Sequence, residues 1–195
     1  MEDIHLECFR ELLYHDGFFY PSGISKTFML TPSFFTYLHS DAIKTMEWLK
    51  QLLIQEKLWI DGQFLFENML IPACIKNSHW ILIHINVWNN TFFLINPYHP
   101  TEPHQGDFNR CNVLIANISQ YFNLPTLYLS VPAIINQLPP QIQETIDCGV
   151  FIAVFCLAII ETNLQSTPDF LTLDEYRFLM VVWFLTKSKP SLFLP

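Results

Sequence analysis

The chain of 195 residues has few charges, few glycines and no long hydrophobic run. Charged residues make up 14% of the sequence, with 10 Lys and Arg against 18 Asp and Glu, and the formal net charge is -8. A chain so poor in basic residues lacks the composition of a general nucleic-acid binder, so nucleic acid is not an expected partner. The longest apolar stretch covers residues 149–160, whereas a membrane-spanning helix needs about 20 residues. We therefore expect no membrane association either.

The five cysteines match neither a disulfide scaffold nor a zinc site. Their number is odd, no CxxC pair is present, and the acidic N-terminus lacks the apolar region of a secretory signal. These features indicate a reducing compartment, and we expect a cytoplasmic or nuclear protein with reduced thiols. His99 and His104 lie near acidic residues, but their spacing fits no standard zinc set. We expect no metal and no cofactor.

Apolar and aromatic residues are abundant, at 51% and 15% of the chain. A chain of this length and composition can bury a hydrophobic core without covalent staples. The sequence contains neither an internal repeat nor a recognisable linker. We therefore expect a single domain over residues 1–195, and a monomer.

Helical and strand patterns alternate along the chain. The spacing of apolar residues predicts helices over residues 4–13, 33–55, 113–122, 147–160 and 173–186, the second broken near His39 and Ser40. Runs of β-branched and aromatic residues predict strands over residues 69–71, 80–85, 92–95 and 126–130. Asn89–Asn90 is typical of a turn and makes a hairpin of the middle two strands. Helices packed on a small, mostly antiparallel sheet give an α+β fold.

Cys148 is the best candidate for a nucleophile among the cysteines. It directly precedes a strongly apolar helix, where unpaired amides and the helix dipole favour a thiolate. His79 is the candidate general base, because it opens a strand after a polar loop and can project from the sheet edge. The predicted hairpin returns the chain at Asn96, beside His79, where an asparagine can accept the imidazole N–H. An oxyanion hole would combine the Cys148 amide with a side-chain donor from Gln141 or Gln143.

Two motifs carry a resemblance to a known family. Ile71-Pro72 precedes His79-Trp80 and a hairpin, and Pro140-Gln141 precedes D-C-G at residues 147–149 and an apolar helix. This arrangement resembles the ubiquitin-like protease (Ulp/SENP) family of cysteine peptidases, whose clan includes the adenovirus maturation protease. The segments F-F-T-Y-L, F-E-N-M-L-I-P and E-Y-R-F-L-M-V-V-W-F-L are also similar to that family, so the likeness covers essentially the whole chain. It implies a papain-like or adenain-like cysteine protease fold.

The resemblance also implies roles for individual residues. It makes Cys148 the nucleophile, His79 the base, Asn96 the orienting residue and Gln141 the oxyanion donor, with Gln143 as the alternative. Trp80 would form one wall of a narrow substrate cleft, and Gly149 would let the substrate come close.

Three departures from the family pattern accompany these roles. Asn96 stands where most relatives have Asp, and Ile142 replaces the second of two adjacent glutamines. The Trp-Leu motif that opens many family domains is not recognisable.

Three functions follow as hypotheses. The first is a thiol protease or isopeptidase that processes or deconjugates a ubiquitin-like modifier such as SUMO, ubiquitin or NEDD8. The second is a maturation protease of the adenain type, encoded by a virus or mobile element, which cleaves precursor proteins or peptides in a host cell or virion. The departure at Asn96 also leaves a third, a catalytically silent module of the same fold that binds a modifier or peptide.

Overall fold

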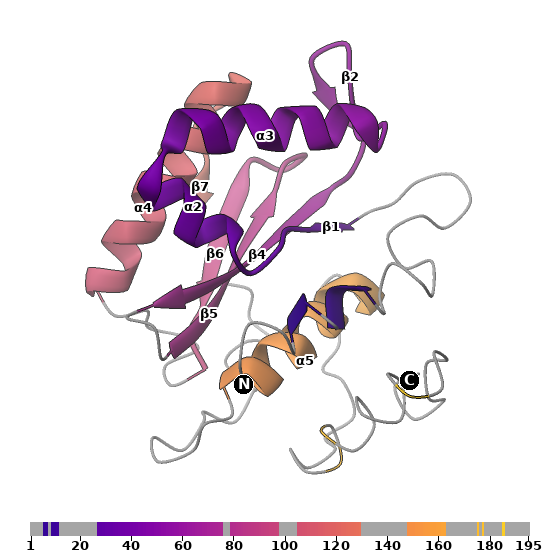
Figure 1. Cartoon of the computed structure of the whole chain (residues 1–195), viewed down its shortest axis with the longest axis vertical. Helices are drawn as coiled ribbons and strands as arrows, with labels where there is room; N and C mark the ends of the chain where they lie inside the picture. The colour runs from indigo at the N-terminus through magenta and orange to yellow at the C-terminus, as the bar shows by residue number, and fades with distance from the viewer. Residues whose placement is uncertain are drawn as a thin grey trace.

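The computed structural model describes residues 6–7, 9–11, 27–75, 79–97, 105–129 and 148–162, together with residues 175, 177 and 185. Residues 6–7 and 9–11 are helical. The elements that follow, shown in Figure 1, are β1 (Thr27–Met29), α2 (Phe34–Ser40), α3 (Ala42–Gln55), β2 (Trp59–Ile60), β3 (Gln63–Phe64), β4 (Asn68–Ile75), β5 (His79–Asn86), β6 (Thr91–Ile95), α4 (Gln105–Phe122), β7 (Tyr128–Leu129) and α5 (Cys148–Thr162).

The main sheet has five strands in the order β1-β4-β5-β6-β7. The inner strands β4, β5 and β6 form an antiparallel meander, whereas β1 pairs with β4 and β7 pairs with β6 in parallel. The outer pairs are parallel because α2 and α3 separate β1 from β4, and α4 separates β6 from β7, so that each connection crosses over the sheet. The fold is α+β as expected, with a mixed sheet.

The inner strands are buried on both faces. One face carries Met69, Ile83 and Leu94, which pack in a cluster with α2, α3 and α4, and the other carries Leu70 and Leu82, which pack with α5. Figure 1 agrees, since α5 lies on the opposite side of the sheet from α3. Alternation of side chains along each strand produces the two layers. The inner strands therefore read as continuous apolar runs, because both of their faces enter a core.

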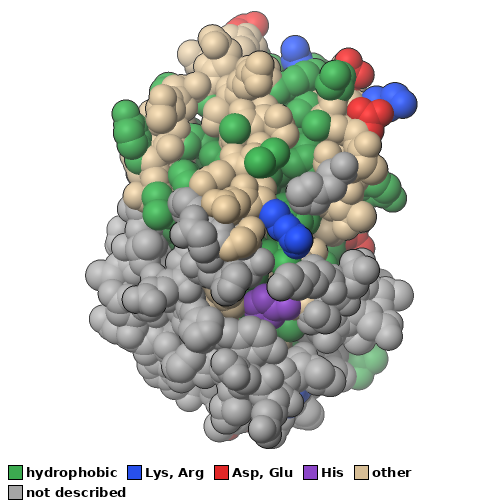
Figure 2. Space-filling model, turned by 90° about the vertical axis from the view of Figure 1, so that its left-hand side faces the viewer, with side chains coloured by type: hydrophobic (Ala, Val, Ile, Leu, Met, Phe, Trp, Pro, Cys, Tyr) green, Lys and Arg blue, Asp and Glu red, His purple; other side chains and the backbone are tan. Residues whose placement is uncertain are grey.

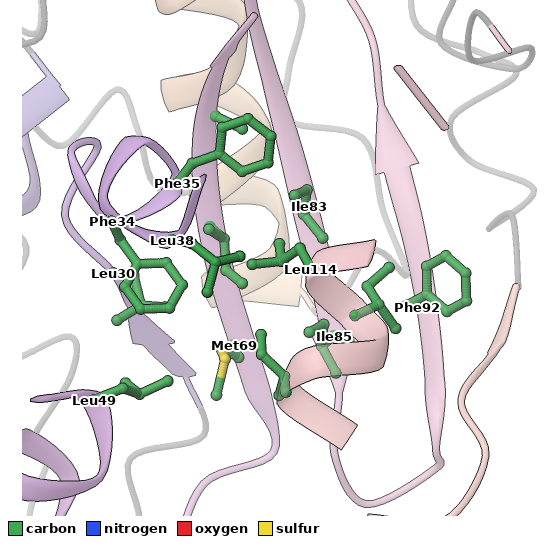
Figure 3. Packing of buried hydrophobic residues seen from close by; sticks show 14 of the residues in the cluster. Leu30, Phe34, Phe35, Leu38, Leu49, Met69, Ile83, Ile85, Phe92 and Leu114 are labelled. Atoms are coloured by element: carbon green, nitrogen blue, oxygen red, sulfur yellow. The ribbon is translucent and has the colours of Figure 1, made fainter. Parts of the chain in front are cut away.

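The first core is built around α2 and α3 (Figure 3). Phe34, Phe35 and Leu38 of α2 and Leu49 of α3 point toward the sheet, and all four are buried. The predicted break between these helices falls at Asp41, whose side chain caps α3 by accepting from the Lys44 amide at 3.1 Å. The break lets two short helices cover one sheet face.

Other sequence expectations are corrected or extended. The hairpin of β2 and β3 and the short strand β1 were not predicted, and α4 begins earlier than its predicted start at Val113. Asp61 and Gly62 turn that hairpin with φ values of 51° and 81°. The helix predicted over residues 173–186 lies mostly outside the described residues. Among the helices that the structure describes, none is both long and apolar enough to span a membrane.

Candidate active site

His79 and Asn96 meet at one end of the sheet. His79 is the first residue of β5, and Asn96 directly follows β6. Leu82 pairs with Ile95, so Asn96 falls one step beyond the last pair and on the same sheet face as His79. The His79 Nε2 atom lies 2.9 Å from the Asn96 Oδ1 atom. The sequence prediction that the hairpin would bring these two residues together is confirmed.

This hydrogen bond defines how the imidazole can act. An amide oxygen only accepts, so Nε2 carries the hydrogen and donates it to Asn96. In the neutral ring the basic lone pair is then on Nδ1, which is shielded from solvent. Asn96 itself is buried, with 4% of its surface exposed, which fixes the ring from one side. The pair is therefore a preset base whose basic lone pair is on Nδ1.

Cys148 begins α5 and lies in the core layer on the α5 side of the sheet. Its side chain is 3% exposed and belongs to a buried cluster that also contains Trp80 and Ile95. The helix packs on β5, the strand that begins with His79. The hydrogen bonds of the described residues join the His79 ring to Asn96, and none of them joins it to the Cys148 thiol.

The remaining predicted site residues are placed as follows. Trp80 is 3% exposed and packs in the cluster with Cys148, and Gly149 is buried in the first turn of α5. Gln141, Gln143 and Asp147 lie outside the described residues, as do His99 and His104. Cys156 is fully buried in α5, where burial raises the pKa of its thiol, so it behaves as a small buried hydrophobe.

A buried polar cluster lies between β4 and β5, formed by Glu67, Asn68, His84 and Asn86. His84 Nε2 lies 2.8 Å from Asn68 Oδ1, and Asn86 Nδ2 donates to Glu67 Oε1 at 3.0 Å and to Asn68 Oδ1 at 3.3 Å. The His84 ring also contacts Phe93 edge-on, with 4.5 Å between ring centroids. Burial lowers the pKa of His84 from 6.5 to about 3.

The polar partners of His84 were not predicted from the sequence. His84 interrupts the apolar run of β5, whereas Asn68 begins β4 and Asn86 ends β5, and these polar positions were the available signal. The strand pairing shows why they belong together: Asn68 is directly opposite Asn86, and His84 is opposite the neighbouring Leu70.

Metal ligation and a basic surface find no support in the described part of the chain. No group of three or more His, Cys, Asp or Glu side chains there could hold a metal ion. On the face that Figure 2 shows, the described Lys and Arg side chains are separated by hydrophobic and neutral ones and do not form a patch.

Comparisons with known proteins agree with this architecture. The model of the Ulp1 protease family, C-terminal catalytic domain, matches residues 1–190. A search of curated protein sequences finds no match.

Several solved structures share the fold. The C-terminal Ulp1 protease domain in complex with Smt3, the yeast ortholog of SUMO, is 16% identical with a TM-score of 0.68 over 97% of this chain and 78% of that one. The Ulp1-like SUMO protease catalytic domain of Chaetomium thermophilum is 20% identical with a TM-score of 0.67, over 100% and 75%. The Xanthomonas campestris effector XopD bound to ubiquitin is 14% identical with a TM-score of 0.58, over 93% and 90%.

Proposed function

The chain belongs to the Ulp1 protease family of cysteine proteases, and from this membership we propose that it cleaves after the C-terminal glycine of a ubiquitin-like modifier. The reaction would process a modifier precursor or release the modifier from a conjugate. The observation that carries the proposal is the 2.9 Å hydrogen bond between His79 and Asn96 at the end of the sheet on which α5 packs. Similar folds bind SUMO in one solved structure and ubiquitin in another.

Cys148, His79 and Asn96 divide the chemistry in this proposal. The Cys148 sulfur attacks the carbonyl carbon after the glycine while His79 Nδ1 takes the thiol proton. The imidazolium then gives that proton to the leaving amine, and a thioester remains on Cys148. Water, deprotonated by His79, hydrolyses the thioester and frees the enzyme. The Cys148 amide and the Gln141 side chain would bind the oxyanion, with Gln143 as the alternative donor.

In this proposal the thiol reaches the base around the end of β5. Cys148 lies in the α5 layer, and the pleat of β5 directs His79 with Ile81 toward the opposite layer. Because His79 is the first residue of its strand, the thiol can approach its ring around the strand end. Catalytic hydrogen bonds are often long in free enzymes and shorten when substrate binds. Substrate binding is the step at which we expect the thiol and Nδ1 to meet.

Asn96 sets the electrostatics of the proposed site. An amide accepts the Nε2 hydrogen as a carboxylate would, and so holds the same tautomer. It brings no negative charge, so it stabilises the imidazolium less than an aspartate does. We therefore propose an active protease in which the protonated base is less favoured than in relatives that have Asp.

The test uses SUMO, ubiquitin and NEDD8, each carrying a C-terminal electrophile that a catalytic thiol captures. We expect at least one of them to form a covalent adduct on Cys148, identified by peptide mass. The Cys148→Ala variant should form none, and Cys156→Ser is the matched control, since Cys156 lies in the same helix and is fully buried. Failure of all three modifiers to label Cys148 would overturn the modifier assignment.

A maturation protease is the second candidate, favoured by Asn96 at the position where most modifier proteases have Asp. Such an enzyme would cleave extended peptides at internal small-residue motifs and leave folded modifiers intact. A peptide library separates the two. Internal cleavage that depends on Cys148, together with no labelling by the modifier probes, would select this candidate.

A further inference from the structure

Cys74 is a second thiol near the end of the sheet where the proposed active site lies. It is directly opposite Trp80 in the β4–β5 ladder, and the next pair is Ile75 with His79. Directly opposed residues share a face, with β-carbons about 5 Å apart, so Cys74 lies beside Trp80 on the α5 side of the sheet. Its side chain is partly exposed and packs against the cluster that contains Trp80 and Cys148.

In the proposed function, Cys148 approaches the same end of the β4–β5 ladder. If Cys148 meets His79, its sulfur lies next to the β4–β5 pairs that end the ladder, which are Ile75 with His79 and Cys74 with Trp80. Both thiols then lie at the same end of one strand pair, and Cys74 approaches that end from the α5 side. Cys74 is accessible enough to react, because its side chain is only partly buried.

The other described cysteines are less suited than Cys74 to react with Cys148. Cys156 is fully buried, and burial raises the pKa of its thiol, which disfavours the thiolate needed for exchange. It also lies eight residues along α5 from Cys148, or about 12 Å at 1.5 Å per residue. Cys111 is buried in the cluster on the opposite face of the sheet.

We propose that Cys74 is a resolving cysteine, which forms a reversible disulfide with Cys148 when a hydroperoxide oxidises the nucleophile. The inference rests on the proposed function, because it needs Cys148 to be a reactive thiol at this end of the sheet. The disulfide would protect the nucleophile from irreversible oxidation.

The chemistry balances with hydrogen peroxide as the oxidant. The Cys148 thiolate attacks one peroxide oxygen, the O–O bond breaks, and a sulfenic acid forms with release of water after protonation. The Cys74 sulfur then attacks the Cys148 sulfur, the S–O bond breaks, and the Cys74 proton leaves with the hydroxide as a second water. Two thiols and one peroxide therefore give one disulfide and two waters. A thiol reductant reverses the product by exchange.

The experiment exposes the full chain to hydrogen peroxide, blocks remaining thiols by alkylation, and maps peptides by mass without reduction. We expect a Cys74–Cys148 disulfide, with modifier-probe labelling lost and then restored by dithiothreitol. In Cys74→Ser and Cys74→Ala the disulfide should be absent, sulfinic and sulfonic acids should accumulate on Cys148, and dithiothreitol should restore less than about a tenth of the labelling. Cys156→Ser should behave like the unaltered protein.

The readouts separate this inference from the proposed function. A reduced protein that is labelled at Cys148 but forms no Cys74–Cys148 disulfide overturns the inference and leaves the proposed function standing. A disulfide in a protein that no modifier probe labels supports the thiol pair and overturns the modifier assignment. Full recovery of labelling in both Cys74 variants would overturn the resolving role.

Discussion

Acid should destabilise the protein through His84, and His84→Gln should remove that effect. The His84 side chain is 4% exposed, and its Nε2 hydrogen is donated to Asn68. Its Nδ1 is buried without a hydrogen-bond partner among the described residues, so a second proton there would bring a charge into an apolar core layer. Glutamine can still donate to Asn68 but does not titrate.

The pKa shift gives the size of the effect. Burial lowers the pKa of His84 from 6.5 to about 3 in the folded state. Above pH 6.5 the residue is neutral in both states and adds no pH dependence. Below pH 6.5 the unfolded chain binds a proton that the folded chain does not, so the free energy of unfolding falls by about 1.4 kcal/mol per pH unit. The loss reaches about 2 kcal/mol at pH 5 and continues until the folded residue titrates near pH 3.

Urea unfolding of both proteins at pH 7, 6 and 5 measures this difference. Carboxylates titrate similarly in the unaltered protein and in His84→Gln. The quantity to compare is therefore the gap between the unfolding free energies of these two proteins. Relative to its value at pH 7, that gap should shift by about 2 kcal/mol in favour of His84→Gln at pH 5. Parallel pH profiles would refute the reasoning, because they would mean that His84 is solvated or charged in the folded state.

Three further predictions follow from the site and the fold. Asn96→Ala should slow probe labelling of Cys148 by about 10- to 100-fold. Asn96→Asp should keep the labelling rate within about tenfold and move the acidic limb of the pH–rate profile to higher pH, because a carboxylate stabilises the imidazolium. Equal labelling rates for Asn96→Ala and the unaltered protein would exclude the orienting role of Asn96. Leu49→Ala removes a fully buried side chain and should cost about 2–5 kcal/mol of unfolding free energy, and a loss below 1 kcal/mol in urea titration would contradict the packing of α3. Gly62→Ala should cost roughly 1 kcal/mol, because Gly62 has φ +81° and open space where a β-carbon would lie; a much larger loss by the same titration would mean that the turn makes a contact absent from this structure.

The sequence predicted the fold where local periodicity is strong. The hairpin of β5 and β6, the break between α2 and α3, and α5 all follow from runs long enough to show a period. β1 has three residues and β2 and β3 have two each, which is too short for alternation to be recognised. The strand predicted over residues 126–130 contains β7, but the parallel direction of the outer strands was not predicted, because it depends on which connections cross over the sheet.

In the candidate site, too, some contacts could be predicted from the sequence and others could not. The length of the β5–β6 hairpin determines which residue returns beside the start of β5, so the contact of His79 with Asn96 could be predicted. The partners of His84 could not, since they depend on the register of β4 against β5 and on burial of both faces. The catalytic roles of Cys148 and Gln141 remain predictions.

The difference between local and distant strand pairing has a consequence for how the protein folds. The meander of β4, β5 and β6 joins neighbours in sequence, such as Ile75 with His79, whereas Thr27 pairs with Asn68 across about 40 residues. Closing a short loop loses less chain entropy, so we expect the meander to form early and β1 to join it late. The strands that carry His79 and Asn96 belong to the meander. The geometry of this pair is thus encoded within a short, contiguous stretch of the chain, and changes in the distant crossovers should alter the folding rate more than the position of the imidazole.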